Sequence, residues 1–112
     1  MGPRFENWQP PEFGLDGMTK WHWLCQYHEN LQLGRDSDIG AFTYINARHG
    51  VEIGEGVQIG SHCSIYSWST IDDKAGKVTI KRNAKLGTHS VVMPGVTIGE
   101  NAVVYGIPIK ER

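Results

Sequence analysis

An aliphatic residue returns every six positions from Leu33 to Val104, and this period is the most regular feature of the chain. Two steps break it, one of eight residues after Ile45 and one of nine residues after Ile71. The twelve positions are Leu33, Ile39, Ile45, Ile53, Ile59, Ile65, Ile71, Ile80, Leu86, Val92, Ile98 and Val104. A period of six does not keep to one face of a helix with 3.6 residues per turn, so it predicts short strands.

A second set of residues lies two positions before each aliphatic residue. Its members are Leu31, Ser37, Thr43, Val51, Val57, Cys63, Ser69, Val78, Ala84, Ser90, Val96 and Ala102. All but Leu31 are small or β-branched, and strand side chains alternate between two faces, so both sets face the interior. We expect three hexads to form one triangular coil, and stacked coils to bury a shared apolar column. A β-sandwich is the alternative, but its strands would not keep a six-residue phase for so long.

The repeat divides the chain into three parts: a capping segment (1–30), a repeat domain (31–106) and a short tail (107–112). Large residues alternate over Trp21–Tyr27, which favours a strand there. The competing prediction is a short helix that begins at Thr19. We expect the strand to lie across the open end of the first coil.

The composition is that of one domain, with 112 residues of which 39% are apolar, and a formal net charge of −1. No basic run is present, so neither nucleic acid nor an anionic membrane is an expected partner. No apolar stretch approaches the roughly 18 residues of a membrane span, and the first residues lack the apolar core of a signal peptide. Cys25 and Cys63 show no metal-ligand spacing, which predicts reduced thiols and a cytoplasmic protein.

The segment Gly87–Val104 reads GTHSVVMPGVTIGENAVV, and Tyr105–Lys110 follows with a Gly-x-Pro-x-Lys pattern. Together they resemble the closing blocks of hexapeptide-repeat acyltransferases, the family of sugar O- and N-acetyltransferases. The resemblance covers roughly residues 29–110 and implies a left-handed parallel β-helix of about four triangular coils. It also implies a homotrimer, active sites between subunits, acetyl-CoA as acyl donor, no required metal, and a sugar or nucleotide-sugar acceptor acylated on a hydroxyl or amine.

The general base must differ from that of the galactoside and maltose acetyltransferases in this family. Their catalytic histidine lies in a loop one hexad after the position of Ile65, where this chain has Ser67–Asp73 and no histidine. Histidine is the usual base near neutral pH, and the candidates are His62 and His89, each three residues after an aliphatic position. By hexad count the two histidines fall on different faces of the coil, so we expect them to meet only across a subunit boundary.

The expected acceptor contacts come from the two interruptions of the repeat and from one outward position between them. In the family these contacts tend to come from the first loop, which makes Asn46, Arg48 and His49 the candidates here. Trp68 is either a platform for a sugar ring or a trimer contact. Asp72, in the second loop, is a candidate to orient a histidine or to bind an amino sugar.

The donor site is expected around His89, where the resemblance assigns Gly87, Thr88 and Ser90 to contacts with CoA. Relatives usually carry one more coil after the position of Val104, so a shortened donor site is expected. A non-catalytic assembly module is therefore the alternative function. A γ-class carbonic anhydrase shares the fold, but its His-x4-His zinc pair is missing, because the fifth residue after His89 is Pro94.

Overall fold

The computed structural model describes residues 6–108. Residues 109–112 lie outside the described part, and with them most of the expected tail and Lys110 of the Gly-x-Pro-x-Lys pattern. The protein is all-β with parallel sheets, and within residues 6–108 the helical structure is confined to the 3-10 turn η1, His28–Asn30. No helix of this part of the chain has both the length and the apolar character needed to cross a membrane.

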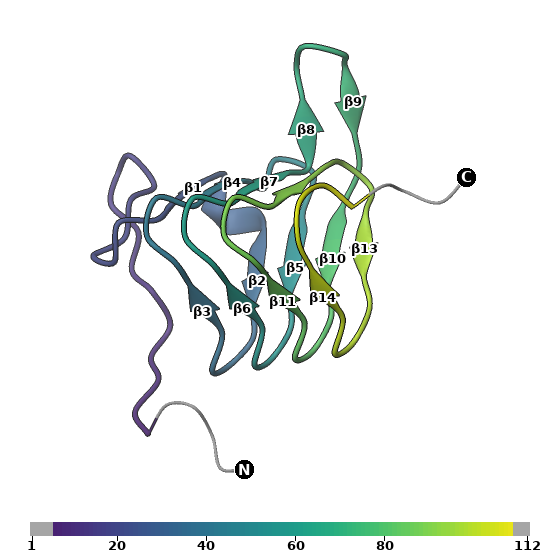
Figure 1. Ribbon diagram of the computed structural model, residues 1–112. Coiled ribbons are helices and arrows are strands. Elements are labelled where there is room, and N and C mark those ends of the chain that lie inside the picture. Colours follow the sequence, from purple (N-terminus) through teal and green to yellow (C-terminus); the bar gives the residue numbers. More distant parts are fainter. Residues whose placement is uncertain (1–5, 109–112) are drawn as a thin grey trace.

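Three four-stranded parallel sheets make up the body of the molecule (Figure 1). Sheet A contains, in spatial order, β1 (Leu24–Gln26), β4 (Tyr44–Asn46), β7 (Ser64–Tyr66) and β12 (Val91–Val92). Sheet B contains β2 (Leu31–Leu33), β5 (Val51–Ile53), β10 (Val78–Ile80) and β13 (Thr97–Ile98). Sheet C contains β3 (Asp38–Ile39), β6 (Gln58–Ile59), β11 (Lys85–Leu86) and β14 (Val103–Val104).

The chain visits sheets A, B and C in turn, so each strand pairs with the strand one circuit later. The aliphatic positions are in register between circuits: Ile45 pairs with Ile65, and Ile59 with Leu86. This arrangement of parallel sheets is compatible with the predicted β-helix. Glycine permits the close stacking at the corners, since a Cβ on Gly40 would lie 2.5 Å from the backbone nitrogen of Ser61.

The core lies between the three sheets and is built from both periodic sets of residues. The bulkiest of its fully buried side chains are Ile45, Ile53, Ile65 and Ile80. Members of the small set lie beside them, with Val57, Val78 and Ala84 completely buried. The two inward-facing registers are thus confirmed for most of the repeat.

Ile71 is an exception, and its assignment to the repeat is wrong. The chain leaves the sheets after β7 and forms an antiparallel hairpin, β8 (Trp68–Ser69) and β9 (Lys74–Ala75), that projects from the body (Figure 1). Ile71 lies between these strands and is 96% exposed. The strand predicted around Ile71 is thus missing from the sheets, and β1 is the twelfth parallel strand of the described residues. Cys25 of β1 is buried and pairs with Ile45.

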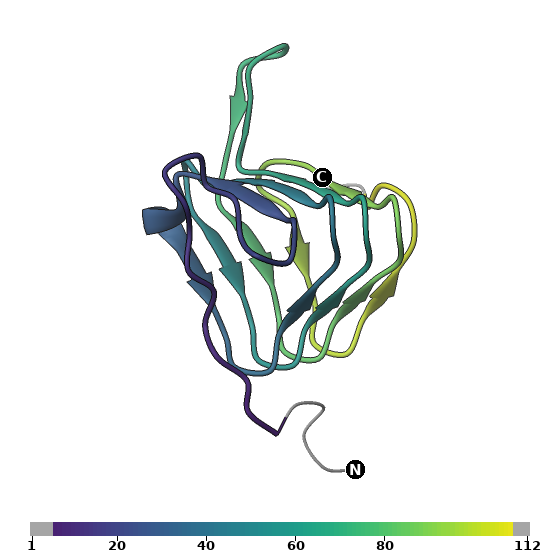
Figure 2. The same ribbon diagram turned by 90° about the vertical axis from the view of Figure 1, so that its left-hand side faces the viewer.

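The expected N-terminal strand is confirmed as β1, but it joins sheet A edge to edge instead of crossing the end of the coil. Trp23 is buried, whereas Trp21 and Tyr27 at the ends of the alternating segment are exposed. Residues before β1 pass over the end of the sheets (Figure 2), where the indole nitrogen of Trp8 donates to the Ser37 carbonyl oxygen at 2.9 Å.

Candidate functional site

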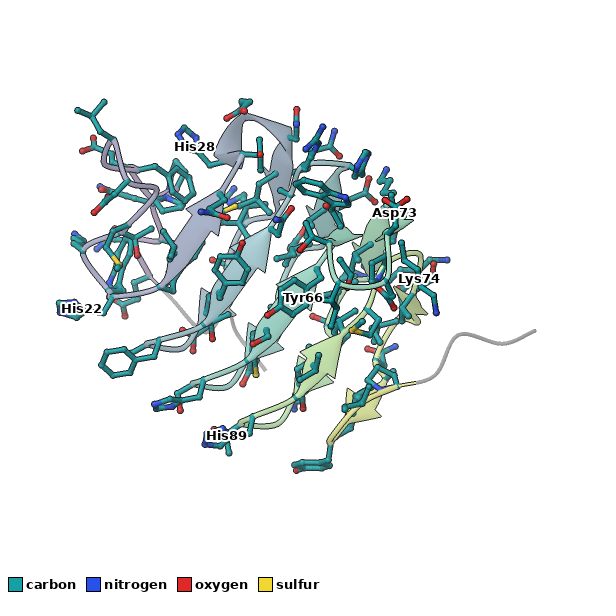
Figure 3. The ribbon with its side chains drawn as sticks, turned by 90° about the horizontal axis from the view of Figure 1, so that it is seen from above. His22, His28, Tyr66, Asp73, Lys74 and His89 are labelled. Carbon is teal, nitrogen blue, oxygen red and sulfur yellow. The ribbon has the colours of Figure 1, made fainter. Side chains whose placement is uncertain are left out.

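Four aromatic side chains form a column at the corner where the chain enters sheet A. Each lies two residues before a strand of that sheet and has a positive φ: His22 (69°), Phe42 (66°), His62 (57°) and His89 (62°). Successive ring centroids are 6.5, 5.1 and 4.9 Å apart. All four side chains are exposed, and Figure 3 shows His22 and His89 on the same edge of the molecule. We call these residues the histidine column.

The expectation that His62 and His89 lie on different faces is wrong, because the two imidazole rings stack within one chain. The hexad count included Ile71, which lies in the hairpin, and therefore counted one strand too many between the two histidines. In the structure Leu86 pairs with Ile59, so the residues that follow them occupy equivalent corners one circuit apart.

Hydroxyl groups flank the stacked histidines. The Thr88 hydroxyl donates to the Ser61 carbonyl oxygen at 2.7 Å, and the two side-chain oxygens are 3.2 Å apart. Cys63 lies behind this corner, with its sulfur 3.3 Å from the Gly87 carbonyl oxygen. Burial raises the pKa of the Cys63 thiol, so it is protonated near neutral pH and poorly suited to act as a nucleophile. The imidazoles are therefore the accessible bases at this corner.

The residues assigned to CoA contacts differ in accessibility. Thr88 is exposed beside His89, whereas the Tyr105 ring covers Gly87, whose Cβ, if present, would lie 2.2 Å from that ring. Ser90 is fully buried, and its hydroxyl donates to the Gly87 carbonyl oxygen at 2.7 Å. The Ser90 hydroxyl therefore holds the corner together from inside, and the expected contact of Ser90 with CoA stays a prediction.

Four of the five residues expected to contact the acceptor lie near the corner where the chain leaves sheet A, at the other ends of its strands from the histidine column. The Asn46 side chain accepts a hydrogen bond from the Arg48 backbone nitrogen at 3.1 Å. The Arg48 guanidinium carbon lies 4.0 Å from the centroid of the Trp68 ring, and the His49 ring lies edge-on to Trp68 at 6.3 Å. The His49 backbone nitrogen donates to the Ser67 hydroxyl at 3.0 Å, which ties the first loop to the base of the hairpin.

Asp72 is not part of this cluster. It lies in the hairpin with its carboxylate 3.7 Å from the Lys74 ammonium, and a hydrogen bond from Ser69 lowers the pKa of its carboxyl group. None of its contacts within residues 6–108 is to a histidine of the same chain, and its expected role in orienting a histidine or binding an amino sugar stays a prediction. Figure 3 labels its neighbours Asp73 and Lys74 on the projecting hairpin.

A cleft of about 520 Å³ lies on the outer face of sheet A, beside the hairpin. We call it the sheet A cleft, and it is lined by Gln26, Tyr27, Tyr44, Asn46, Tyr66, Trp68, Ser69, Thr70, Ile71 and Met93. The Tyr44 and Tyr66 rings contact each other at 5.6 Å. Sequence reasoning missed both tyrosines, although each adjoins an inward aliphatic residue and so had to face outward.

The Tyr44 hydroxyl is held in place inside this cleft. It donates to the side-chain oxygen of Gln26 and accepts a hydrogen bond from the Asn46 amide at 3.3 Å. Burial is the main reason why the pKa of Tyr44 is raised, with the Asn46 hydrogen bond acting in the opposite direction. Tyr66 differs, because within residues 6–108 its hydroxyl has no hydrogen-bond partner and can bind a ligand.

No protein-family model, curated protein or solved structure matches the chain. Within residues 6–108 there is also no group of three histidine, cysteine or carboxylate side chains arranged to hold a metal ion. Function is therefore inferred from the chemistry of the histidine column and the sheet A cleft.

Proposed function

We propose that the chain is an acyltransferase that uses an acyl-CoA, in the first place acetyl-CoA, and acylates a hydroxyl or amine of a sugar or nucleotide sugar. The observation that carries the proposal is the exposed stack of His62 on His89, two imidazoles at one corner beside the hydroxyls of Ser61 and Thr88. The proposed fold is a left-handed parallel β-helix; the strict order of sheets A, B and C supports the helical path of the chain, and the handedness is that of the acyltransferases it resembles.

The chemistry needs one base and a place for the thioester. An imidazole removes the proton from the acceptor hydroxyl or amine while the acceptor oxygen or nitrogen attacks the thioester carbonyl carbon. The carbon–sulfur bond then breaks, the acyl group stays on the acceptor, and the CoA thiolate takes up a proton. His62 and His89 are both exposed and both suited to this role.

The proposal includes a homotrimer, and the distance between the histidine column and the sheet A cleft supports it. His62 lies two residues before β7 and Tyr66 at the end of that strand, which separates their Cα atoms by up to about 13 Å. One chain therefore does not bring its own histidine column next to a sugar in its sheet A cleft. A neighbouring subunit that packs its column against the cleft would complete the site.

The proposal places the protein in the cytoplasm, where acyl-CoA is made and thiols stay reduced. Cys25 and Cys63 are both free and buried, which fits that compartment.

A second candidate, a non-catalytic assembly module, is favoured by apolar side chains at the last strand. Val103, Tyr105 and Ile107 are 60%, 79% and 62% exposed, which suits burial against another molecule.

An assay of CoA thiol release separates the two candidates. The full chain is incubated with acetyl-CoA and a panel of neutral, amino and acidic sugars, and CoA binding is measured in parallel by calorimetry. Acceptor-dependent thiol release supports the acyltransferase. The absence of both thiol release and CoA binding across the panel would leave the assembly module.

A further inference from the structure

The sheet A cleft combines flat aromatic surfaces with hydrogen-bonding groups. Tyr44, Tyr66 and Trp68 contribute the rings, and the Tyr66 hydroxyl and Thr70 provide polar groups at the cleft surface. Sugar rings present apolar C–H faces and a rim of hydroxyls, so aromatic rings and polar groups in one cleft of about 520 Å³ suit a single saccharide unit. This mixture distinguishes the cleft from a purely apolar groove.

Arg48 borders the cleft, and its guanidinium group is unpaired among the described residues. Its guanidinium carbon lies 4.0 Å from the Trp68 ring centroid and 6.0 Å from that of Tyr27, and both rings line the cleft. Within residues 6–108 its guanidinium group has no carboxylate partner and no hydrogen bond. Contact with two rings restricts the guanidinium plane, and a planar guanidinium with free donors matches the two oxygens of a carboxylate or phosphate.

Among the described charged residues near the cleft, Arg48 is available to bind an anion. Lys77 lines the adjoining hollow together with Arg48, but its ammonium group pairs with Glu52 at 3.3 Å. Glu29 lines the same hollow and lies outside ion-pair distance of Arg48. An anion at the end of the cleft would therefore meet an arginine that no described carboxylate neutralises.

We infer that the sheet A cleft binds a saccharide that carries an anionic group, either a carboxylate or a phosphate. The sugar ring lies against the aromatic side chains, and Arg48 binds the anion through two parallel hydrogen bonds. The identification of this saccharide with the acyl acceptor rests on the proposed function, whereas binding itself does not. The acidic group would then select the acceptor, because a neutral sugar leaves Arg48 without a partner.

Calorimetry with the full chain in the absence of CoA tests the inference. The probes are glucuronate, glucose 1-phosphate and glucose, which share a ring and differ in the anion. We expect at least one acidic probe to bind on the order of 10-fold more tightly than glucose, since hydrogen bonds to a charged group are about twice as strong as neutral ones. The tighter of the two acidic probes identifies the anion as carboxylate or phosphate.

Three variants test whether Arg48 causes the preference for acidic probes. Arg48→Gln removes the charge and should abolish the preference for acidic probes, and Arg48→Lys should restore it only in part, because an ammonium group lacks the planar fork. Lys77→Gln is the matched control, a nearby exposed cation that is already paired, and should keep the full preference. Arg48 and Lys77 are both exposed, so all three variants should retain the fold, which thermal unfolding verifies.

Two results would overturn the inference: no binding of any probe at millimolar concentration, or equal binding of glucose and both acidic probes. Retention of the preference in Arg48→Gln would overturn the role of Arg48. Failure of the proposed function looks different, because an acidic sugar would then bind with no thiol release from acetyl-CoA. Thiol release with neutral sugars alone would support the acyltransferase and contradict the acidic site.

Discussion

The imidazole rings of His62 and His89 stack at 4.9 Å although 27 residues separate them in sequence. They meet because β11 pairs with β6, with Leu86 opposite Ile59, and the β8–β9 hairpin is inserted without shifting the phase of the sheets. The stack is thus a property of the repeat, and it requires no contact from the hairpin.

Replacement of the two histidines should remove acyl transfer. The double variant His62→Asn/His89→Asn is expected to lower acceptor-dependent thiol release by roughly 100-fold or more, the usual contribution of a general base. Asparagine is chosen because it tolerates the positive φ of both corners. The single variants then show which imidazole is the base.

His22→Asn is the control, because His22 occupies the same kind of corner at the far end of the column. Its rate should equal that of the unmodified chain. An unchanged rate in the double variant would exclude His62 and His89 from the chemistry.

The exposure of Ile71 can be tested by stability measurements. Ile71→Ser should change the free energy of unfolding by no more than about 0.5 kcal/mol, the usual range for surface substitutions. Ile65→Ala, at a fully buried position of the same repeat, should cost about 2–5 kcal/mol. Urea titration of both variants provides the comparison, and equal destabilisation by the two would place Ile71 in the core.

The buried thiol of Cys25 should make stability depend on alkaline pH. Burial, with a smaller contribution from Glu29, raises the pKa of this thiol from 9.0 to about 12. The folded state therefore favours the protonated thiol, and the resulting stabilisation is complete below pH 9 and is lost as the pH rises toward 12. Other groups titrate in this range, so the difference between the unmodified chain and Cys25→Ala is the quantity to measure.

That difference in the free energy of unfolding should decrease between pH 9 and pH 12. A constant difference across this range would mean that the Cys25 thiolate is as stable in the folded chain as in the unfolded one.

The hairpin should be removable without loss of the fold. Trp68 and Ala75 are paired, so residues 69–74 can be replaced by Asn-Gly, which suits a two-residue turn between antiparallel strands. We expect the shortened chain to unfold cooperatively with similar stability and to lose sugar binding, because Ser69, Thr70 and Ile71 line the sheet A cleft. Unchanged sugar affinity would exclude the hairpin from the site.

The parallel strands and the inward faces of the repeat could be predicted from the sequence, because period and residue size both report on packing. The hairpin could not, since Ser69 fits the small set and Ile71 the aliphatic set, and only the exposure of Ile71 in the structure shows that the repeat is interrupted there. The interval from Ile65 to Ile80 has two readings, one more hexad followed by a loop, or a single loop. That ambiguity also hid the contact between His62 and His89.

The site was predictable only in part. Arg48 and His49 were found because they lie in the first loop, where polar residues interrupt the repeat, and Trp68 because a large aromatic residue at an outward position of the repeat is unusual. The roles of Tyr44 and Tyr66 depend on contacts between successive circuits, and these contacts follow from the register of the sheets and not from any local motif.

The most direct test of acyl transfer at the histidine column is a structure of the chain with CoA and an acidic sugar. The CoA sulfur should lie within a few ångströms of the imidazole of His62 or His89, and the sugar should occupy the sheet A cleft of a neighbouring subunit. A CoA sulfur remote from both histidines would contradict the proposed chemistry.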